Sequence, residues 1–183
     1  MNYFSRIGIS DEEVLARVNE CFNTIFFDKE DGFYHDVDPD SGCMEDTGNV
    51  DARTEGMSYG MMIAVQLDKK DVFDRLWRWS QKYMQHPDGP REGYFAWSCR
   101  TDGSRNSWGS ASDGELYYIT ALLFASNRWG NDTGIDYKAE AQHILNCSME
   151  KTGEGGAMPL INPENKLITF TPDRGCSRST DPS

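Results

Sequence analysis

The chain has 183 residues, of which 38% are hydrophobic and 12% aromatic, and it carries a formal net charge of -12. This charge disfavours binding to nucleic acid or to an anionic membrane surface, so a neutral ligand is the better partner. The length suits one hydrophobic core, and we expect a single domain over residues 1–183. No apolar run reaches the roughly 18 residues of a membrane-spanning helix, and the N-terminus lacks a secretory pattern, which predicts a soluble, cytoplasmic protein.

Cysteine and histidine spacing gives no sign of a metal centre. The five cysteines are odd in number and widely spaced, without a Cys-x-x-Cys pair, and the three histidines are scattered. The acidic run from Asp36 to Asp46 lacks the glycine and glutamate that a calcium loop requires at its sixth and twelfth positions. We therefore predict free thiols, no metal site and no cofactor.

Apolar residues spaced three and four apart predict five helices. Ser10, followed by three acidic residues, is the expected N-cap of the first helix, which runs to about residue 27. Asp71 is the expected N-cap of the third helix, and Gly130 follows the fourth. The second to fifth helices are expected over residues 57–67, 71–84, 114–129 and 137–149.

Long polar segments separate these helices. Turn residues between Asp28 and Thr54 argue against regular structure over much of that stretch, whereas residues 160–170 could form a short hairpin. Neither a βαβ rhythm nor a glycine-rich phosphate loop is present. The pattern predicts an all-α protein, with paired helices that suit a ring of helical hairpins and loops that build its functional face.

Two acidic residues, Glu55 and Asp113, stand where irregular, glycine-flanked stretches run into helices. The segment between them is rich in tryptophan and tyrosine, side chains that stack on sugar rings. This combination indicates carbohydrate chemistry performed by carboxylates. The alternatives are structural: Glu55 could be a carboxylate at a helix start that interacts favourably with the helix dipole, and Asp113 could be an N-cap.

Candidate substrate-binding residues surround the two carboxylates in the sequence. Trp97 and Trp108 lie in polar surroundings, which favours stacking on a sugar over packing in the core. Tyr59 and Tyr94 could serve either purpose and remain candidates. Arg53 could pair with an acidic neighbour or donate hydrogen bonds to the substrate.

Three motifs carry a family resemblance: Arg-Thr-Glu-Gly-Met-Ser-Tyr-Gly-Met, Gly-Tyr-Phe-Ala-Trp and Ser-Ala-Ser-Asp-Gly-Glu-Leu-Tyr-Tyr. From about residue 27 to residue 172 the sequence resembles glycoside hydrolase family 8, and within it the reducing-end xylose-releasing exo-oligoxylanases. The resemblance implies an (α/α)6 toroid and inverting hydrolysis of β-1,4-linked glycans. It also implies that Glu55 is the general acid and that Asp113 binds and distorts the sugar.

The same resemblance implies that this chain corresponds to the N-terminal half of such a toroid, which has about twice as many helices as we predict here. The family's catalytic base would lie in the other half, and residues 180–183 look like the start of the next helix. Apolar faces near residues 122–124 would be uncovered, which predicts self-association or a complementing C-terminal half. A non-catalytic, glycan-binding half-toroid remains the alternative function.

Overall fold

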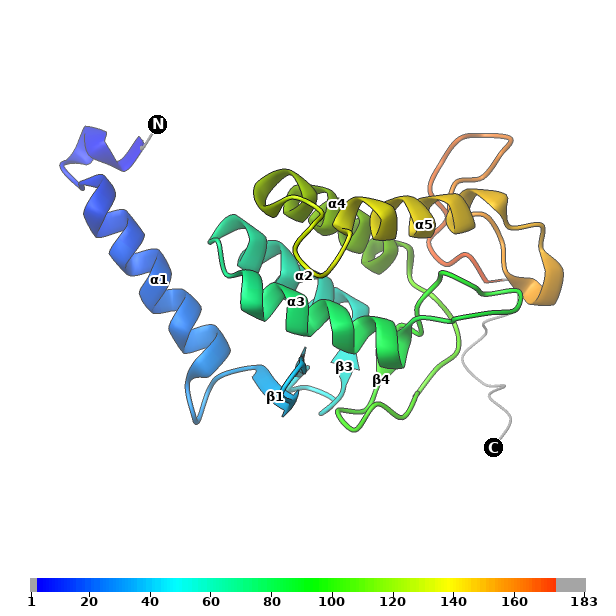
Figure 1. The fold of residues 1–183 in the computed structure, drawn as a ribbon, viewed down its shortest axis with the longest axis horizontal. Coiled ribbons are helices and arrows are strands. Elements are labelled where there is room, and N and C mark those ends of the chain that lie inside the picture. Colours follow the sequence, from blue (N-terminus) through cyan, green and yellow to red (C-terminus); the bar gives the residue numbers. More distant parts are fainter. Residues whose placement is uncertain (1–2, 174–183) are drawn as a thin grey trace.

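A computed structural model describes residues 3–173 of the chain. Five α-helices dominate it: α1 (Asp11–Phe27), α2 (Thr54–Gln66), α3 (Lys70–Trp79), α4 (Ser112–Trp129) and α5 (Tyr137–Glu150). Helices α2 and α3 form one hairpin and α4 and α5 another, and the two hairpins pack through α2 and α4 (Figure 1). The prediction of an all-α scaffold built from helical hairpins is confirmed. The expected helix start at residues 180–183 lies outside the described part.

Helix α1 begins at the predicted N-cap, Ser10, which forms a capping box with Glu13. The Ser10 hydroxyl accepts a hydrogen bond from the Glu13 backbone N–H at 3.2 Å, and the Glu13 carboxylate accepts one from the Ser10 N–H at 2.8 Å. Only Phe22 and Phe26 are buried on this helix. Figure 1 shows α1 leading away from the helical body, so most of its length has no partner helix.

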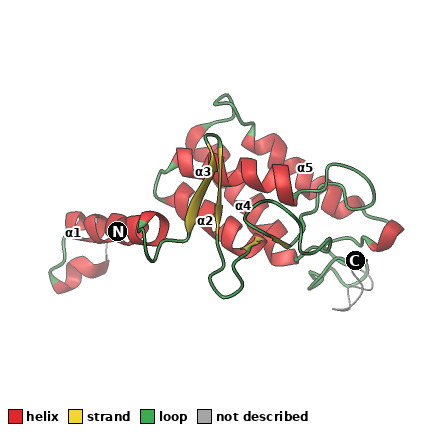
Figure 2. Ribbon diagram, turned by 90° about the horizontal axis from the view of Figure 1, so that it is seen from below, coloured by secondary structure: helices red, strands yellow, loops and turns green. Residues whose placement is uncertain are grey.

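A β-hairpin occupies part of the segment that we expected to be irregular. Strand β1 (Tyr34–Asp38) pairs antiparallel with β2 (Ser41–Met44), and β2 packs against α3 (Figure 2). The prediction was wrong here because the turn residues only connect two short strands, of which β2 is buried throughout. The hairpin expected over residues 160–170 is reduced to a single bridge between Ile161 and Ile168.

Three helices start earlier than predicted, and α4 begins at Ser112 where the sequence predicted residue 114. Helix α2 begins at Thr54, directly after the short strand β3 (Ala52–Arg53), which pairs with β4 (Ser98–Cys99). The N-cap of α3 is Lys69, and Asp71 instead lies in the first turn, 3.3 Å from Arg75. Helix α3 ends at Trp79 and continues as one π-helical segment, η2 (Ser80–Met84). The earlier start of α2 matters because it places Glu55 inside the helix.

The core lies between the two helical hairpins and strand β2. Its large, fully buried side chains include Phe73, Leu76, Trp77, Trp79, Met57, Met61, Phe95 and Tyr118. Burial of these groups is the main stabilising contribution to the fold. The cysteines Cys21, Cys43, Cys99 and Cys147 are free thiols, as predicted, and Cys176 lies outside the described residues. Within residues 3–173, no helix combines the length and apolar character needed to cross a membrane.

Candidate active site

The first turns of α2 and α4 pack directly on each other. A Cβ atom added at Gly114 would come within 2.5 Å of the Thr54 Cβ and 2.6 Å of its Oγ1. The two helices can approach this closely only because residue 114 has no side chain. Glu55 follows Thr54 and Asp113 precedes Gly114, so the contact brings both carboxylates to the same end of neighbouring helices.

Both carboxylates occupy the second residue of their helix. The N-cap of α2 is Arg53 and that of α4 is Ala111, and neither provides a side-chain cap. Asp113 is therefore not the N-cap, which corrects the structural alternative proposed from the sequence. Asp113 is exposed and Glu55 half-buried, and the Thr54 hydroxyl lies 3.5 Å from a Glu55 carboxylate oxygen. Negative charge is favoured at both positions by the helix dipoles.

Two tyrosines lie one helical turn beyond the carboxylates. Tyr59 follows Glu55 by four residues and Tyr117 follows Asp113 by four, so each pair shares one helix face. The two rings meet edge to face with centroids 4.8 Å apart, although 44% of Tyr59 and 41% of Tyr117 stay exposed. Partial burial raises the pKa of Tyr59, and the charges of Asp113 and Glu55 raise it further. The Tyr59 hydroxyl is therefore close enough to interact electrostatically with both carboxylates.

We call Glu55, Tyr59, Asp113 and Tyr117 the acidic group. Tyr117 was not among the residues selected from the sequence. The signal that could have identified it is its position four residues after Asp113, which repeats the spacing between Glu55 and Tyr59.

Arg53 pairs with acidic neighbours and supports an aromatic ring. Its Nε lies 2.9 Å from an Asp46 carboxylate oxygen and 3.0 Å from one of Asp51. Its guanidinium stacks over the half-buried Trp97 at 5.2 Å from the ring centroid. The Trp97 carbonyl accepts a hydrogen bond from the Thr54 N–H at 3.0 Å, which holds this tryptophan beside the start of α2. Arg53 therefore orients Trp97 next to Glu55.

A buried carboxylate joins the loops that carry this tryptophan. Asp51 accepts a hydrogen bond of 2.7 Å from the Ser98 hydroxyl, and the Asn106 amide donates to Ser98 at 3.0 Å. Strand β3, strand β4 and the segment before Trp108 are thus fixed to one another. Such a network keeps aromatic side chains in place without a ligand.

Trp108 is an exposed ring on a rigid support. It is 56% exposed and stacks on the buried ring of His86, with centroids 5.7 Å apart. Because the Arg105 guanidinium can only donate, its 3.0 Å contact makes His86 Nδ1 the acceptor, and Nε2 then donates to the Trp108 carbonyl. Burial and then the charge of Arg105 lower the pKa of His86 to about 4. A neutral imidazole therefore supports Trp108 at neutral pH.

Tyr94 does not lie where a sugar could reach it. Its side chain is fully buried, and its hydroxyl donates to the Met158 carbonyl at 2.7 Å. The prediction of substrate contact is corrected to a packing role, because a buried ring with a bonded hydroxyl offers no face to a ligand. The motif could not distinguish Tyr94 from Trp97, three residues later.

Glu115 is a second residue that the sequence did not single out. It is fully buried next to Asp113, and one carboxyl oxygen accepts a hydrogen bond from the Phe95 N–H at 3.0 Å. The other oxygen has no partner among the described residues. Burial raises the pKa of Glu115 to about 8, and the charge of Asp113 adds to this. Glu115 is therefore largely neutral at pH 7 and adds little charge to the acidic group.

Comparison with known proteins places this arrangement in a family. The sequence pattern of the glycosyl hydrolases family 8 matches residues 34–165. A reducing end xylose-releasing exo-oligoxylanase from Halalkalibacterium halodurans is 48% identical over 176 residues, which cover 94% of this chain and 45% of the relative. A protein of the same description from Bifidobacterium adolescentis is 43% identical and matches 98% of this chain and 47% of its own length.

Solved structures agree with the sequence comparison. The structure of Rex8A from Paenibacillus barcinonensis, complexed with xylose, superposes with a TM-score of 0.88 at 47% identity. The match covers 93% of this chain and 46% of that one. Such neighbours are (α/α)6 toroids, so the prediction that this chain forms part of one is confirmed. The chain spans about half the length of these relatives.

Proposed function

This chain belongs to glycosyl hydrolases family 8, and we propose that it provides the acid-bearing half of an inverting glycoside hydrolase. The proposed substrates are β-1,4-linked xylo-oligosaccharides, which lose xylose from the reducing end. Relatives at 43–48% identity bear the name of that activity, which supports the choice of substrate. Because the chain spans about half their length, we propose that full activity requires the part that it lacks.

The placement of Glu55 and Asp113 on abutting helix starts is the observation that carries this proposal. Inverting hydrolysis needs a carboxylic acid that protonates the leaving oxygen and a base about 6.5–9.5 Å away that activates water. We assign the acid to Glu55, which is the less exposed of the two carboxylates.

Asp113 has a different proposed role. Its exposed carboxylate would accept hydrogen bonds from hydroxyls of the sugar that is cleaved and would stabilise a distorted ring. This interaction strengthens as the transition state acquires oxocarbenium character, so it contributes to the rate more than to binding. We propose that the hydroxyl groups of Tyr59 and Tyr117, whose rings meet edge to face, donate hydrogen bonds to the same sugar.

Two tryptophans supply the proposed stacking surfaces. Trp108 is exposed and braced by His86, and Trp97 is braced by Arg53. Flat apolar sugar faces stack well on such rings, and a ring that is already fixed loses little conformational entropy when the substrate binds.

The catalytic base is not assigned to this chain. Asp113 would present its carboxylate to the sugar, whereas a base must face the attacking water. We propose that the base comes from the half of the toroid that residues 1–183 do not span. The alternative function, a non-catalytic glycan-binding half-toroid, follows if no base completes the site.

Hydrolysis of xylotriose and xylotetraose tests the proposed function. We expect this chain, combined with the C-terminal half of a relative, to release xylose. The release should be lost in Glu55→Gln and retained in Glu30→Gln, an exposed glutamate outside the site. Proton NMR should detect the shortened oligosaccharide first as its α-anomer, because the reaction inverts a β-linkage. Release that survives Glu55→Gln would refute the assignment of the acid. Binding without release would favour the glycan-binding alternative.

A further inference from the structure

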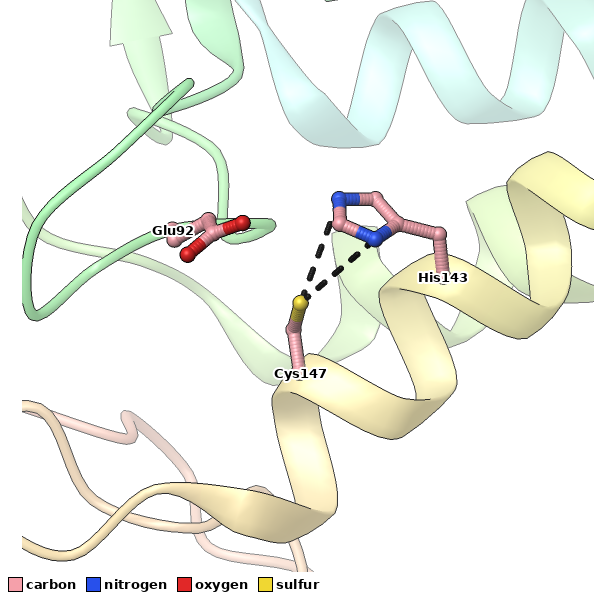
Figure 3. Close-up of side chains that lie close together, drawn as sticks. All are labelled: Glu92, His143 and Cys147. Atoms are coloured by element: carbon pink, nitrogen blue, oxygen red, sulfur yellow. Dashed lines mark hydrogen bonds between the residues drawn. The ribbon is translucent and has the colours of Figure 1, made fainter.

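Three side chains of metal-binding type meet on one side of α5. His143 and Cys147 are four residues apart and share a helix face, and Glu92 reaches them from the loop between η2 and β4 (Figure 3). Their ligand atoms all lie within 4.8 Å of one another, and the Cys147 Sγ is 3.7 Å from His143 Nδ1. None of these residues belongs to the acidic group.

The loop that carries Glu92 is fixed against the helix. Gly93 has a φ of +80°, and a Cβ there would come within 2.6 Å of the Cys147 Cβ, so the loop backbone rests on α5 at this point. The Gly93 N–H donates to the His86 carbonyl at 2.9 Å, and the Lys151 ammonium donates to the Glu92 carbonyl at 2.6 Å. These contacts fix the backbone of Glu92 relative to His143 and Cys147 on α5.

The carboxylate of Glu92 is free to act as a ligand. In the described part of the chain its oxygens make no hydrogen bond. Lys151, whose ammonium donates to the Glu92 backbone oxygen, acts on the carboxylate only through its charge. Glu92 and His143 are exposed, so their side chains can adjust, whereas Cys147 is half-buried. A cation would also be attracted by the net charge of -12.

We propose that Glu92, His143 and Cys147 bind one Zn²⁺ ion, with water as the fourth ligand. Thiolate, imidazole and carboxylate are the three ligand types that Zn²⁺ uses, whereas Mg²⁺ and Ca²⁺ prefer oxygen alone. Metal–ligand distances of about 2.0–2.3 Å in a tetrahedral site put neighbouring ligand atoms about 3.3–3.8 Å apart. The Cys147–His143 separation of 3.7 Å already has this value. The Glu92 carboxylate lies within 4.8 Å of the other two ligand atoms, so it needs to approach them by about 1 Å at most.

Binding exchanges a proton for the metal. Because Zn²⁺ binds the thiolate, binding at Cys147 would release the thiol proton to solvent. The ion would join α5 to the loop that leads into Trp97 and would therefore stabilise that loop. We predicted no metal site from the sequence because the histidines are scattered. The pattern that would suggest this site is His143-x-x-x-Cys147, which places both side chains on one helix face.

Metal titration of the 183-residue chain tests the proposal directly. Co²⁺ should give a thiolate-to-metal charge-transfer absorption that one equivalent of Zn²⁺ abolishes. Cys147→Ala should lose this band, and His143→Gln should weaken Zn²⁺ binding by about 100-fold or more, since even changes next to a ligand cost 10–100-fold. The matched controls, Cys21→Ala and His35→Gln, should bind as the parent does.

Equal Zn²⁺ affinity in the parent and in both site variants would overturn the proposal, as would a chain that binds no Zn²⁺. Circular dichroism spectra establish that each variant is folded. A second readout is thermal unfolding: Zn²⁺ should raise the Tm of the parent and of Cys21→Ala but not that of Cys147→Ala. A rise of the same size in Cys147→Ala would also contradict the proposed site.

Discussion

Glu115, two residues after Asp113, is a neutral carboxyl group at pH 7. Its protonation limits the negative charge next to the acidic group. Glu115 is fully buried and makes one hydrogen bond, from the Phe95 N–H. Its ionisation at neutral pH would place a third charge near Glu55 and Asp113. Burial of Glu115 therefore limits the negative charge around Asp113, whose exposed carboxylate is the one that we propose interacts with the sugar.

Replacement of this group by an isosteric amide tests that conclusion. The pKa of Glu115 is about 8 in the folded protein against 4.5 ordinarily, so the folded state holds the extra proton between these values. Its stabilising contribution is complete below pH 4.5 and is lost as pH rises toward 8, by up to about 1.4 kcal/mol per pH unit. Glu115→Gln should remove this slope.

Urea unfolding of the parent and of Glu115→Gln from pH 5 to pH 8 measures the difference. We expect the variant to gain stability relative to the parent as the pH rises. A difference between the two proteins that does not change with pH would contradict a buried, protonated Glu115.

The functional role of an individual residue was predictable from the sequence only where the residue belonged to a recognisable motif. Glu55 and Asp113 stood out because each follows an irregular stretch and opens a helix. Tyr94 was misjudged since exposure cannot be read from a residue type, and burial of its ring became visible only in the fold. Tyr117 was missed because its partner, Tyr59, lies on a different helix.

At the level of helices, the Thr54–Gly114 contact positions the two carboxylates. A methyl group at residue 114 must displace Thr54 and separate the first turns of α2 and α4. We expect Gly114→Ala to lower the free energy of unfolding by about 1–3 kcal/mol from overpacking, partly offset by about 1 kcal/mol of improved helix propensity. Oligosaccharide binding should weaken as well, because the carboxylates move apart.

Gly56→Ala is the matched control for this change. Gly56 also lies in the first turn of a helix, but its added Cβ would approach nothing closer than 3.8 Å. The control should therefore be neutral or slightly stabilising in a thermal unfolding measurement. If both variants unfold at the same temperature, the close contact does not position the helices.

Helices were easier to predict than the segments between them. Periodic apolar residues and the Ser10 capping box located α1, and Gly130 located the end of α4. The β1–β2 hairpin escaped notice because its strands are short and its turn residues resemble those of any loop. The start of α2 was placed late since its first turn holds polar residues and a glycine.

The molecule as a whole leaves several apolar surfaces uncovered. On α4, Leu123 is 41% and Phe124 50% exposed, whereas Leu122, which we expected to share their exposure, is fully buried. A cavity of about 460 Å³ beside Phe124 lies between α2 and α4. On α1, Leu15 and Phe27 are exposed as well. These surfaces are where a complementing half or a second copy would pack.

Analytical ultracentrifugation tests whether these surfaces associate. We expect the isolated chain to form dimers or larger species at micromolar concentration, because exposed apolar surface is costly in water. Phe124→Gln should shift the distribution toward monomer, and Lys138→Gln, an exposed position on α5, should not. A parent chain that sediments only as a monomer would contradict this prediction.

The number of helices was predictable from the sequence, and it indicated about half of a toroid. The placement of α1 was not predictable, since the apolar side of a helix does not reveal which partner covers it. The extent of the exposed surface follows from packing between elements far apart in the chain, which no local pattern encodes.

The most direct measurement is xylose release from xylotetraose by this chain mixed with a separately produced C-terminal half of the Paenibacillus barcinonensis relative. We expect little release by either part alone, release by the mixture, and its loss when this chain carries Glu55→Gln. Release by the mixture that is unchanged by Glu55→Gln would show that this chain does not supply the catalytic acid.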